Sequence, residues 1–134
     1  MTNSLSQVHI LVDDPDAALG FYRDALGLTV QHEVANEGFR WITLVTESQP
    51  EIGIVLFETH AGRSKEDGDA LAALLAKGEL SPVHIRADDL DATFERVAKA
   101  AGAEVVQEPD TRPWGARDCA VRDPAGNMIR IEQA

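Results

Sequence analysis

Two histidines, His9 and His84, are the side chains of this sequence whose type and spacing best suit metal chemistry. Each is the middle residue of a Val-His-Ile tripeptide, and an offset of 75 residues carries the first onto the second. Two histidines with one carboxylate form the facial triad that suits Fe(II), and mixed histidine and glutamate sets also bind Zn(II), Ni(II) or Mn(II). Glu132, near the end of the chain, is the candidate carboxylate. His9, His84 and Glu132 are therefore the candidate ligands of a divalent-metal site.

Other side chains suit an organic ligand. Trp41 and Trp114 could stack on a flat molecule, or they could simply cover the core and the edge of a sheet. Trp114 lies in the segment 111–118, between two strand-like runs, and Arg117 follows it in the same segment. We expect both tryptophans and Arg117 to be ligand-binding residues.

Arg130 is the candidate anion-binding residue. Its guanidinium could pair in a bidentate fashion with a carboxylate, enolate or phenolate oxygen, and it would repel a divalent cation. The structural alternative is an internal ion pair with one of the many carboxylates, for instance Glu132 or Asp118. In contrast, Cys119 lies in a strand-like run with no histidine nearby in sequence, which indicates a small core residue rather than a reactive thiol.

The overall composition excludes several classes of partner. A net charge of -11 argues against nucleic acid and against anionic membrane surfaces, because phosphate binding depends on clustered lysine and arginine. We find neither a run of about 18 apolar residues, as a membrane span requires, nor the features of a secretion signal in MTNSLSQVHI. We expect a cytoplasmic protein, and 134 residues are enough for one core but not for two ordinary domains.

The elements that position these side chains come from an internal repeat. The segment 8–30 (VHILVDDPDAALGFYRDALGLTV) aligns without a gap on 83–105 (VHIRADDLDATFERVAKAAGAEV). Matching pairs include the two histidines, Asp14 with Asp89, and Gly27 with Gly102. Each copy predicts a strand, a helix capped by the second aspartate, and a glycine that ends the helix.

Three strand-like runs follow each predicted helix, at 28–33, 39–46 and 52–58 in the first half and at 103–108, 116–122 and 127–132 in the second. The unit is therefore βαβββ, present twice. We predict one α+β domain over 1–134, with module one at about 5–60, module two at about 81–134, and a linker at 61–80. In this linker, 62–68 reads as a loop and 69–78 as a short helix.

The first repeat and the segment RDPAGNMIRIE resemble the recurring sequences of the vicinal-oxygen-chelate superfamily, which includes glyoxalases, bleomycin-resistance proteins and extradiol dioxygenases. The resemblance covers nearly the whole chain. It implies an eight-stranded open half-barrel cup with helices outside, a small organic ligand in the cup, and a homodimer. With a period of two along the first strand, His9 and Leu11 would face the cup and Ile10 would face the helices. His84 would then face the same cavity as His9.

The resemblance also implies metal ligands on the first and last strands of each module. Aligning the last strands places Arg130 where a glutamate ligand usually stands, and Ile54 at the equivalent position of the first half. These two residues cannot bind a metal, although a shifted register could turn Glu132 inward. We therefore expect a small-molecule-binding protein whose metal site is degenerate or absent. The alternative is a divalent-metal-dependent lyase, isomerase or dioxygenase that uses His9 and His84.

Overall fold

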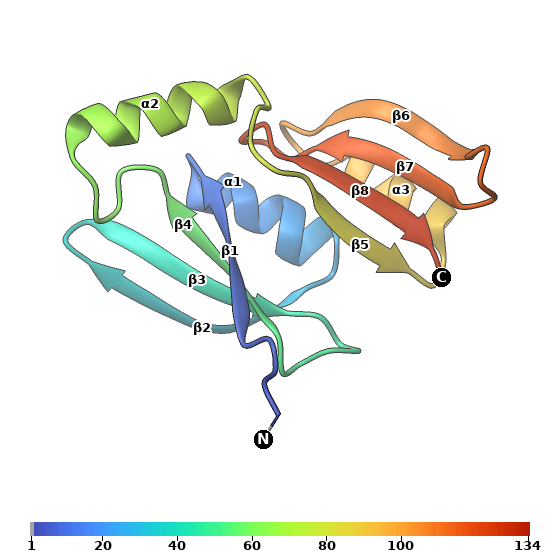
Figure 1. Ribbon diagram of the computed structural model, residues 1–134, viewed down its shortest axis with the longest axis horizontal. Coiled ribbons are helices and arrows are strands. Elements are labelled where there is room, and N and C mark those ends of the chain that lie inside the picture. Colours follow the sequence, from blue (N-terminus) through green and yellow to red (C-terminus); the bar gives the residue numbers. More distant parts are fainter. Residues whose placement is uncertain (1) are drawn as a thin grey trace.

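The computed structural model describes residues 2–134 and confirms an α+β fold of two βαβββ modules (Figure 1). The first module contains β1 (Gln7–Val12), α1 (Pro15–Leu19), η1 (Gly20–Ala25), β2 (Thr29–Asn36), β3 (Phe39–Val45) and β4 (Gly53–Glu58). The helix α2 (Lys65–Ala76) connects the modules. The second module contains β5 (Val83–Ala87), α3 (Leu90–Ala98), β6 (Glu104–Thr111), β7 (Arg117–Arg122) and β8 (Met128–Gln133).

The two modules have the same sheet topology. The strand order is β1-β4-β3-β2 in the first sheet and β5-β8-β7-β6 in the second, and the first and last strands of each module run parallel. A register shift interrupts the β2/β3 ladder after Val30 and the β6/β7 ladder after Val105, which are equivalent positions of the repeat. Bulges of this kind bend a sheet, so each module curves at the same place. The eight strands form two open sheets and not a closed barrel.

Both predicted helix starts are confirmed. The Asp14 carboxylate accepts hydrogen bonds from the backbone amides of Asp16 and Ala17, and the Asp89 carboxylate accepts one from Ala92. These bonds satisfy amides that have no partner within the helix. Each helix thus begins directly after the first strand of its module and lies against the sheet of that module.

Strands β2 and β6 each end three residues later than predicted, at Asn36 and Thr111, and three helix boundaries also differ from the prediction. After Leu19 the first helix continues as the π-helical turn η1. Its hydrogen bonds span five residues in place of the four of an α-helix. Helix α3 ends at Ala98, and the chain makes a further turn before Gly102 reaches a positive φ of 81°. Helix α2 begins at Lys65, within the segment predicted as a loop, because the Ser64 hydroxyl caps it and acidic residues occupy its first turn.

One apolar core joins the modules. It contains the helix-facing residues of both sheets, such as Ile42 and Leu44 of β3 and Ile129 and Ile131 of β8, all fully buried, together with residues of α1, η1 and α3.

No helix within residues 2–134 is long and apolar enough to cross a membrane.

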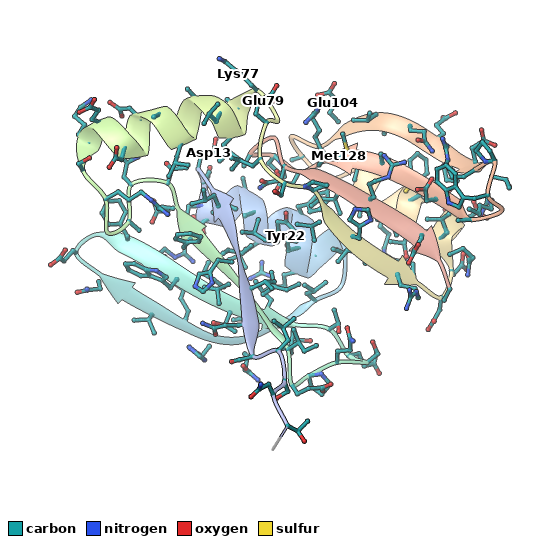
Figure 2. The ribbon with its side chains drawn as sticks, in the orientation of Figure 1. Asp13, Tyr22, Lys77, Glu79, Glu104 and Met128 are labelled. Carbon is teal, nitrogen blue, oxygen red and sulfur yellow. The ribbon has the colours of Figure 1, made fainter. Side chains whose placement is uncertain are left out.

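Polar contacts also fix the modules to each other. The Tyr22 side chain projects from η1 into the middle of the molecule (Figure 2), where its hydroxyl donates to Asp123 Oδ2 at 2.6 Å. Asp123 lies in the turn between β7 and β8, and the side-chain amide of Asn127 from the same turn donates to the Leu11 carbonyl at 2.8 Å. Arg96 of α3 donates to the carbonyl of Ala25 at 3.1 Å. These bonds hold the two sheets in a fixed relation.

Candidate functional site

Each sheet has one face against the helices and one face without a helix, which we call its open face. Ile10 and Val12 of β1 are 4% and 0% exposed and belong to the core, so the alternation of β1 places His9 and Leu11 on the open face. In the second sheet Ile129 and Ile131 belong to the core, and Arg130 between them lies on the open face beside His84. The predicted strand faces of both histidines are therefore confirmed.

The open face of the first sheet is aromatic. The rings of His9 and Phe57 meet edge to face with centroids 5.1 Å apart, and the Arg63 guanidinium lies 5.3 Å from the Phe57 ring centre. Trp41 is the register partner of Phe57 on β3, and Leu11 is its partner on β1. We call His9, Trp41, Phe57 and Arg63 the aromatic face. It presents ring faces and edges to which a flat organic molecule can bind.

The open face of the second sheet is charged. The Arg130 guanidinium contacts Asp118 Oδ2 at 3.2 Å and donates to Gln107 Oε1 at 3.2 Å. Arg112, from the turn between β6 and β7, places its Nε 3.0 Å from Asp118 Oδ1. We call Arg112, Arg130, Asp118 and Gln107 the arginine cluster. Arg130 thus forms the internal ion pair with Asp118 that the sequence offered as an alternative.

Two other predicted ligand residues, Arg117 and Trp114, lie in the same β6–β7 hairpin as most of the arginine cluster but are not members of it. Arg117 points to the helix side of β7 and forms an ion pair with Asp91 of α3 at 2.8 Å. Trp114 is 75% exposed in the turn between β6 and β7. Of the predicted ligand residues, the structure thus places Trp41 and Arg130 on open faces of different sheets and Arg117 on a helix-covered face.

The residues at the expected metal positions do not form a set that fits a divalent ion. The ladder pairs His9 with Val55 and His84 with Arg130, so Val55 and not Ile54 is the equivalent of Arg130. An apolar residue and a cation therefore stand where two ligands would be needed. Within residues 2–134, no group of three histidine, cysteine or acidic side chains converges as a metal site would require. The Glu132 carboxylate instead pairs with Arg86 at 3.0 Å.

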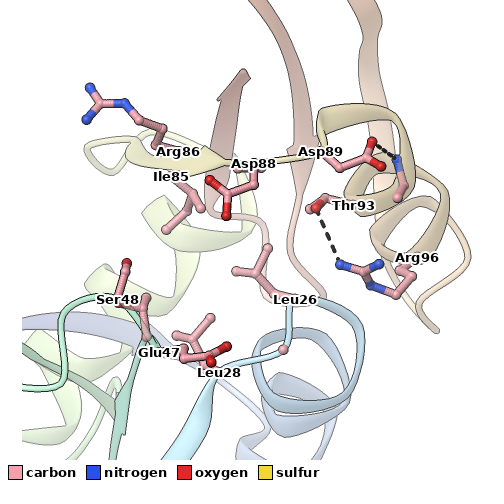
Figure 3. A pocket seen from close by; sticks show the side chains of 14 residues that line it. Leu26, Leu28, Glu47, Ser48, Ile85, Arg86, Asp88, Asp89, Thr93 and Arg96 are labelled. Atoms are coloured by element: carbon pink, nitrogen blue, oxygen red, sulfur yellow. Dashed lines mark hydrogen bonds between the residues drawn. The ribbon is translucent and has the colours of Figure 1, made fainter. Parts of the chain in front are cut away.

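Two adjoining cavities follow the unpaired edge of β5. The larger, of about 710 Å³, lies between Leu26 and Leu28 of the first module and Ile85, Thr93 and Arg96 of the second (Figure 3). The other, of about 500 Å³, is lined by His84, but His9 does not contribute to it. A shared cavity for the two histidines therefore stays a prediction.

Burial changes the acidity of two groups in the core, Cys119 and Tyr22. It raises the pKa of the Cys119 thiol to about 11, with the neighbouring Asp118 carboxylate acting in the same direction. Burial also raises the pKa of the Tyr22 hydroxyl, and the Asp123 carboxylate adds to this shift. A thiol that stays protonated is a poor nucleophile, so Cys119 is suited to packing and not to covalent catalysis.

The sequence analysis did not single out Phe57, Arg63 or the pairing of Arg112 with Asp118. The repeat contained a signal for Phe57. The offset that relates the two histidines also carries Arg130 onto Val55, and Phe57 lies two residues after Val55, on the same face of the strand. The contacts of Arg63 and Arg112 had no such signal, because both residues lie in turns whose conformation the repeat does not determine.

Comparisons with known proteins agree with this architecture. The family model described as Glyoxalase/Bleomycin resistance protein/Dioxygenase superfamily matches residues 4–131. The uncharacterized protein YraH of Bacillus subtilis (strain 168) is 29% identical, over 95% of both chains. The crystal structure of UcmS2 superposes with a TM-score of 0.85 at 32% identity, over 98% of both chains. TnmS3, described as an antibiotic binding protein from Streptomyces sp. CB03234, superposes with a TM-score of 0.71 at 22% identity, over 98% of this chain and 96% of its own.

Proposed function

Because this chain belongs to the glyoxalase, bleomycin resistance protein and dioxygenase superfamily, we propose that it is a metal-independent binding protein for a flat aromatic small molecule. The observation that carries the proposal is the aromatic face. Its rings lie on three neighbouring strands, with Trp41 and Phe57 as register partners and His9 in edge-to-face contact with Phe57, on the open face of the sheet. Such a surface binds a flat ligand by ring stacking and by removal of apolar area from water.

Two further observations support this proposal. The expected metal positions hold Val55 and Arg130, so the donor set lacks the carboxylates that a lyase or dioxygenase of this family would use. The structural relative TnmS3 is described as an antibiotic binding protein, so a protein with this fold is described as binding a small organic molecule. The competing function is metal-dependent catalysis, and the pair His9 and His84 on equivalent strands is the feature that favours it.

We also propose that the protein acts as a homodimer. The exposed valines of the sheets lie on strands at the sheet edges: Val8 of β1, Val34 of β2, and Val105 and Val106 of β6. Edge strands with apolar side chains invite pairing with another chain, and symmetric association is the usual way to cover them. A second copy would therefore protect surfaces that the single chain leaves open.

The binding proposal is tested by titrating EDTA-treated protein with 2-naphthalenemethanol, a neutral flat aromatic, in a calorimeter. We expect saturable binding that Trp41→Ala weakens about tenfold, because a stacking partner and its buried area are lost. Trp41→Phe should retain most of the affinity. Leu74→Ala, which removes an exposed apolar side chain of α2 away from the aromatic face, should bind as the wild type does. Absence of binding to the wild type, or equal loss in the Leu74 variant, would contradict the proposal.

A further inference from the structure

Arg63 is the permanently charged member of the aromatic face. It lies in the turn between β4 and α2, and its guanidinium carbon is 5.3 Å from the centre of the Phe57 ring. Nη1 donates to the Thr59 carbonyl at 3.3 Å, and within residues 2–134 the guanidinium has no acidic partner and no further hydrogen bond. Most of its N–H donors can therefore bind an acceptor that comes from outside the chain.

This arginine has no carboxylate partner within residues 2–134, although the sequence has 23 acidic residues against 12 lysines and arginines. Two other arginines of this part of the chain also lack one. Arg96 joins the modules through the Ala25 carbonyl, and Arg122 holds the β7–β8 turn through the Gly126 carbonyl, each at 3.1 Å. Of these three, Arg63 is the one that lies beside the rings of an open face. Such a cation can recognise an anionic group on an aromatic molecule.

The turn that carries Arg63 is held in place by its neighbours. The two ring nitrogens of His60 contact Thr59 Oγ1 at 3.1 Å and Asp69 Oδ1 of α2 at 2.8 Å. The ring also packs so closely against Gly68 that a Cβ atom there would overlap it. The backbone amide of Arg63 donates to the His60 carbonyl at 3.2 Å. The backbone of Arg63 is thus fixed relative to β4, which reduces the entropy lost when a ligand binds.

The position of Arg63 also decides where a flat ring can stack. Its guanidinium lies over the Phe57 ring, and the His9 ring meets the same phenyl group edge to face. The half-buried Trp41, the register partner of Phe57 on β3, is therefore the stacking surface left for a ligand. Directly opposite residues of antiparallel strands have Cβ atoms about 5 Å apart, so a group attached to a ring on Trp41 can reach the guanidinium over Phe57.

From these contacts we propose that Arg63 determines the ligand class, and that the aromatic face binds flat aromatic carboxylates. The proposal rests on the proposed function and deepens it, because the ring would stack on Trp41 while the carboxylate pairs with the Arg63 guanidinium. A planar carboxylate matches the fork of N–H donors that an arginine presents, and it supplies the counter-ion that Arg63 lacks within residues 2–134. Both contacts lie on one open face of one sheet.

The test compares 2-naphthoate with 2-naphthalenemethanol, which have the same ring system and differ in charge, by calorimetry at pH 7 and low salt. We expect the wild-type protein to bind the naphthoate about fivefold more tightly, against the repulsion of a net charge of -11, because the anion gains charge-assisted hydrogen bonds. Added sodium chloride should reduce the ratio of the two dissociation constants.

Three variants assign this preference to a residue. Arg63→Gln should bring the ratio of the two dissociation constants close to one, because the charge and the fork are both lost. Arg63→Lys keeps the charge without the planar fork and should retain only part of the preference. Arg86→Gln changes the net charge by the same amount, but it removes an exposed arginine of β5 that Glu132 already neutralises, so it should keep the wild-type ratio.

The outcomes separate the role of Arg63 from the binding function. Equal affinity of the wild-type protein for both compounds, a preference that survives in Arg63→Gln, or an equal loss in Arg86→Gln would overturn the role of Arg63, while binding of the alcohol would still support the aromatic face. If neither compound binds, both proposals fail. The wild-type comparison requires no variant, so the preference is measured even if a substitution unfolds the protein.

Discussion

Tyr22 joins the two modules through a buried polar contact, since its hydroxyl donates to Asp123 Oδ2 at 2.6 Å. Burial and the adjacent carboxylate both favour the neutral phenol, and they raise its pKa well above the ordinary 10.0. The contribution to stability is therefore complete below pH 10 and falls as pH rises further, because only the unfolded chain ionises there.

We expect no tyrosinate absorbance at 295 nm from the folded protein at pH 10, and its appearance together with unfolding at higher pH. Tyr22 is the only tyrosine, so the signal belongs to one group. Tyr22→Phe should abolish the signal and should also reduce the steep loss of stability above pH 10. Tyrosinate formation near pH 10 in a protein that is still folded would show that the hydroxyl is not held as described.

The Cys119 thiol supplies a second prediction for a single residue. It is fully buried in β7, and its pKa is raised to about 11. Because the thiolate is the reactive form, native protein at pH 8 should react with a disulfide reagent such as 5,5′-dithiobis(2-nitrobenzoate) only very slowly. Protein in denaturing urea should react within the mixing time of a manual assay. Rapid labelling of the native protein would indicate an accessible thiolate and a different conformation of β7.

At the level of elements, α2 approaches the backbone of the turn between β7 and β8 closely. Gly126 has a φ of 114°, and a Cβ atom there would lie 2.5 Å from the carbonyl oxygen of Leu75 near the end of α2. Gly38 also has a positive φ, of 83°, but has open space around it. The two glycines therefore separate the cost of backbone strain from the cost of the helix contact.

We predict that Gly38→Ala destabilises the protein by about 1–2 kcal/mol through backbone strain alone. Gly126→Ala should cost about 1–3 kcal/mol more, because the overpacked contact must also be relieved. Urea unfolding of both variants measures the difference. Equal destabilisation would show that α2 is not held against the β7–β8 turn.

The sequence predicted the helices and strands well where the internal repeat and the alternation of apolar and polar residues along the strands indicated the same structure. The capping aspartates Asp14 and Asp89 and the strand faces of His9 and His84 follow from local chemistry that is present twice. The start of α2 at Lys65 was missed, because the charged residues that made the segment look like a loop are those that stabilise a helix N-terminus.

The contacts of the candidate site were less predictable. The sequence pointed to Trp41 and Arg130 separately, but the sharing of Asp118 by Arg112 and Arg130 depends on the geometry of a hairpin turn. The placement of Arg117 beside Asp91 depends on how α3 packs on β7. Such contacts join residues far apart in the chain, and neither periodicity nor the repeat contains information about them.

The assembly of the whole molecule is tested by its mass in solution. If a second copy covers the edge strands with the exposed valines, light scattering after size exclusion should give twice the chain mass of 14.5 kDa at micromolar concentration. Val34→Lys, at an edge strand where Val34 is 50% exposed, would identify a β2 contact if it shifted the mass toward the monomer. A wild-type protein that is monomeric at this concentration would refute the homodimer.

The most direct test of metal-independent binding is the dissociation constant of 2-naphthalenemethanol measured twice on the same preparation, after exhaustive EDTA treatment and again after saturation with Zn(II), Ni(II), Mn(II) or Fe(II). Val55 and Arg130 stand where the metal ligands of the family are expected, so the aromatic face should bind the ligand without a metal ion. The two dissociation constants should therefore agree within about twofold. Binding that appears only after one of these metals is restored would contradict the account and would assign the chemistry to His9 and His84.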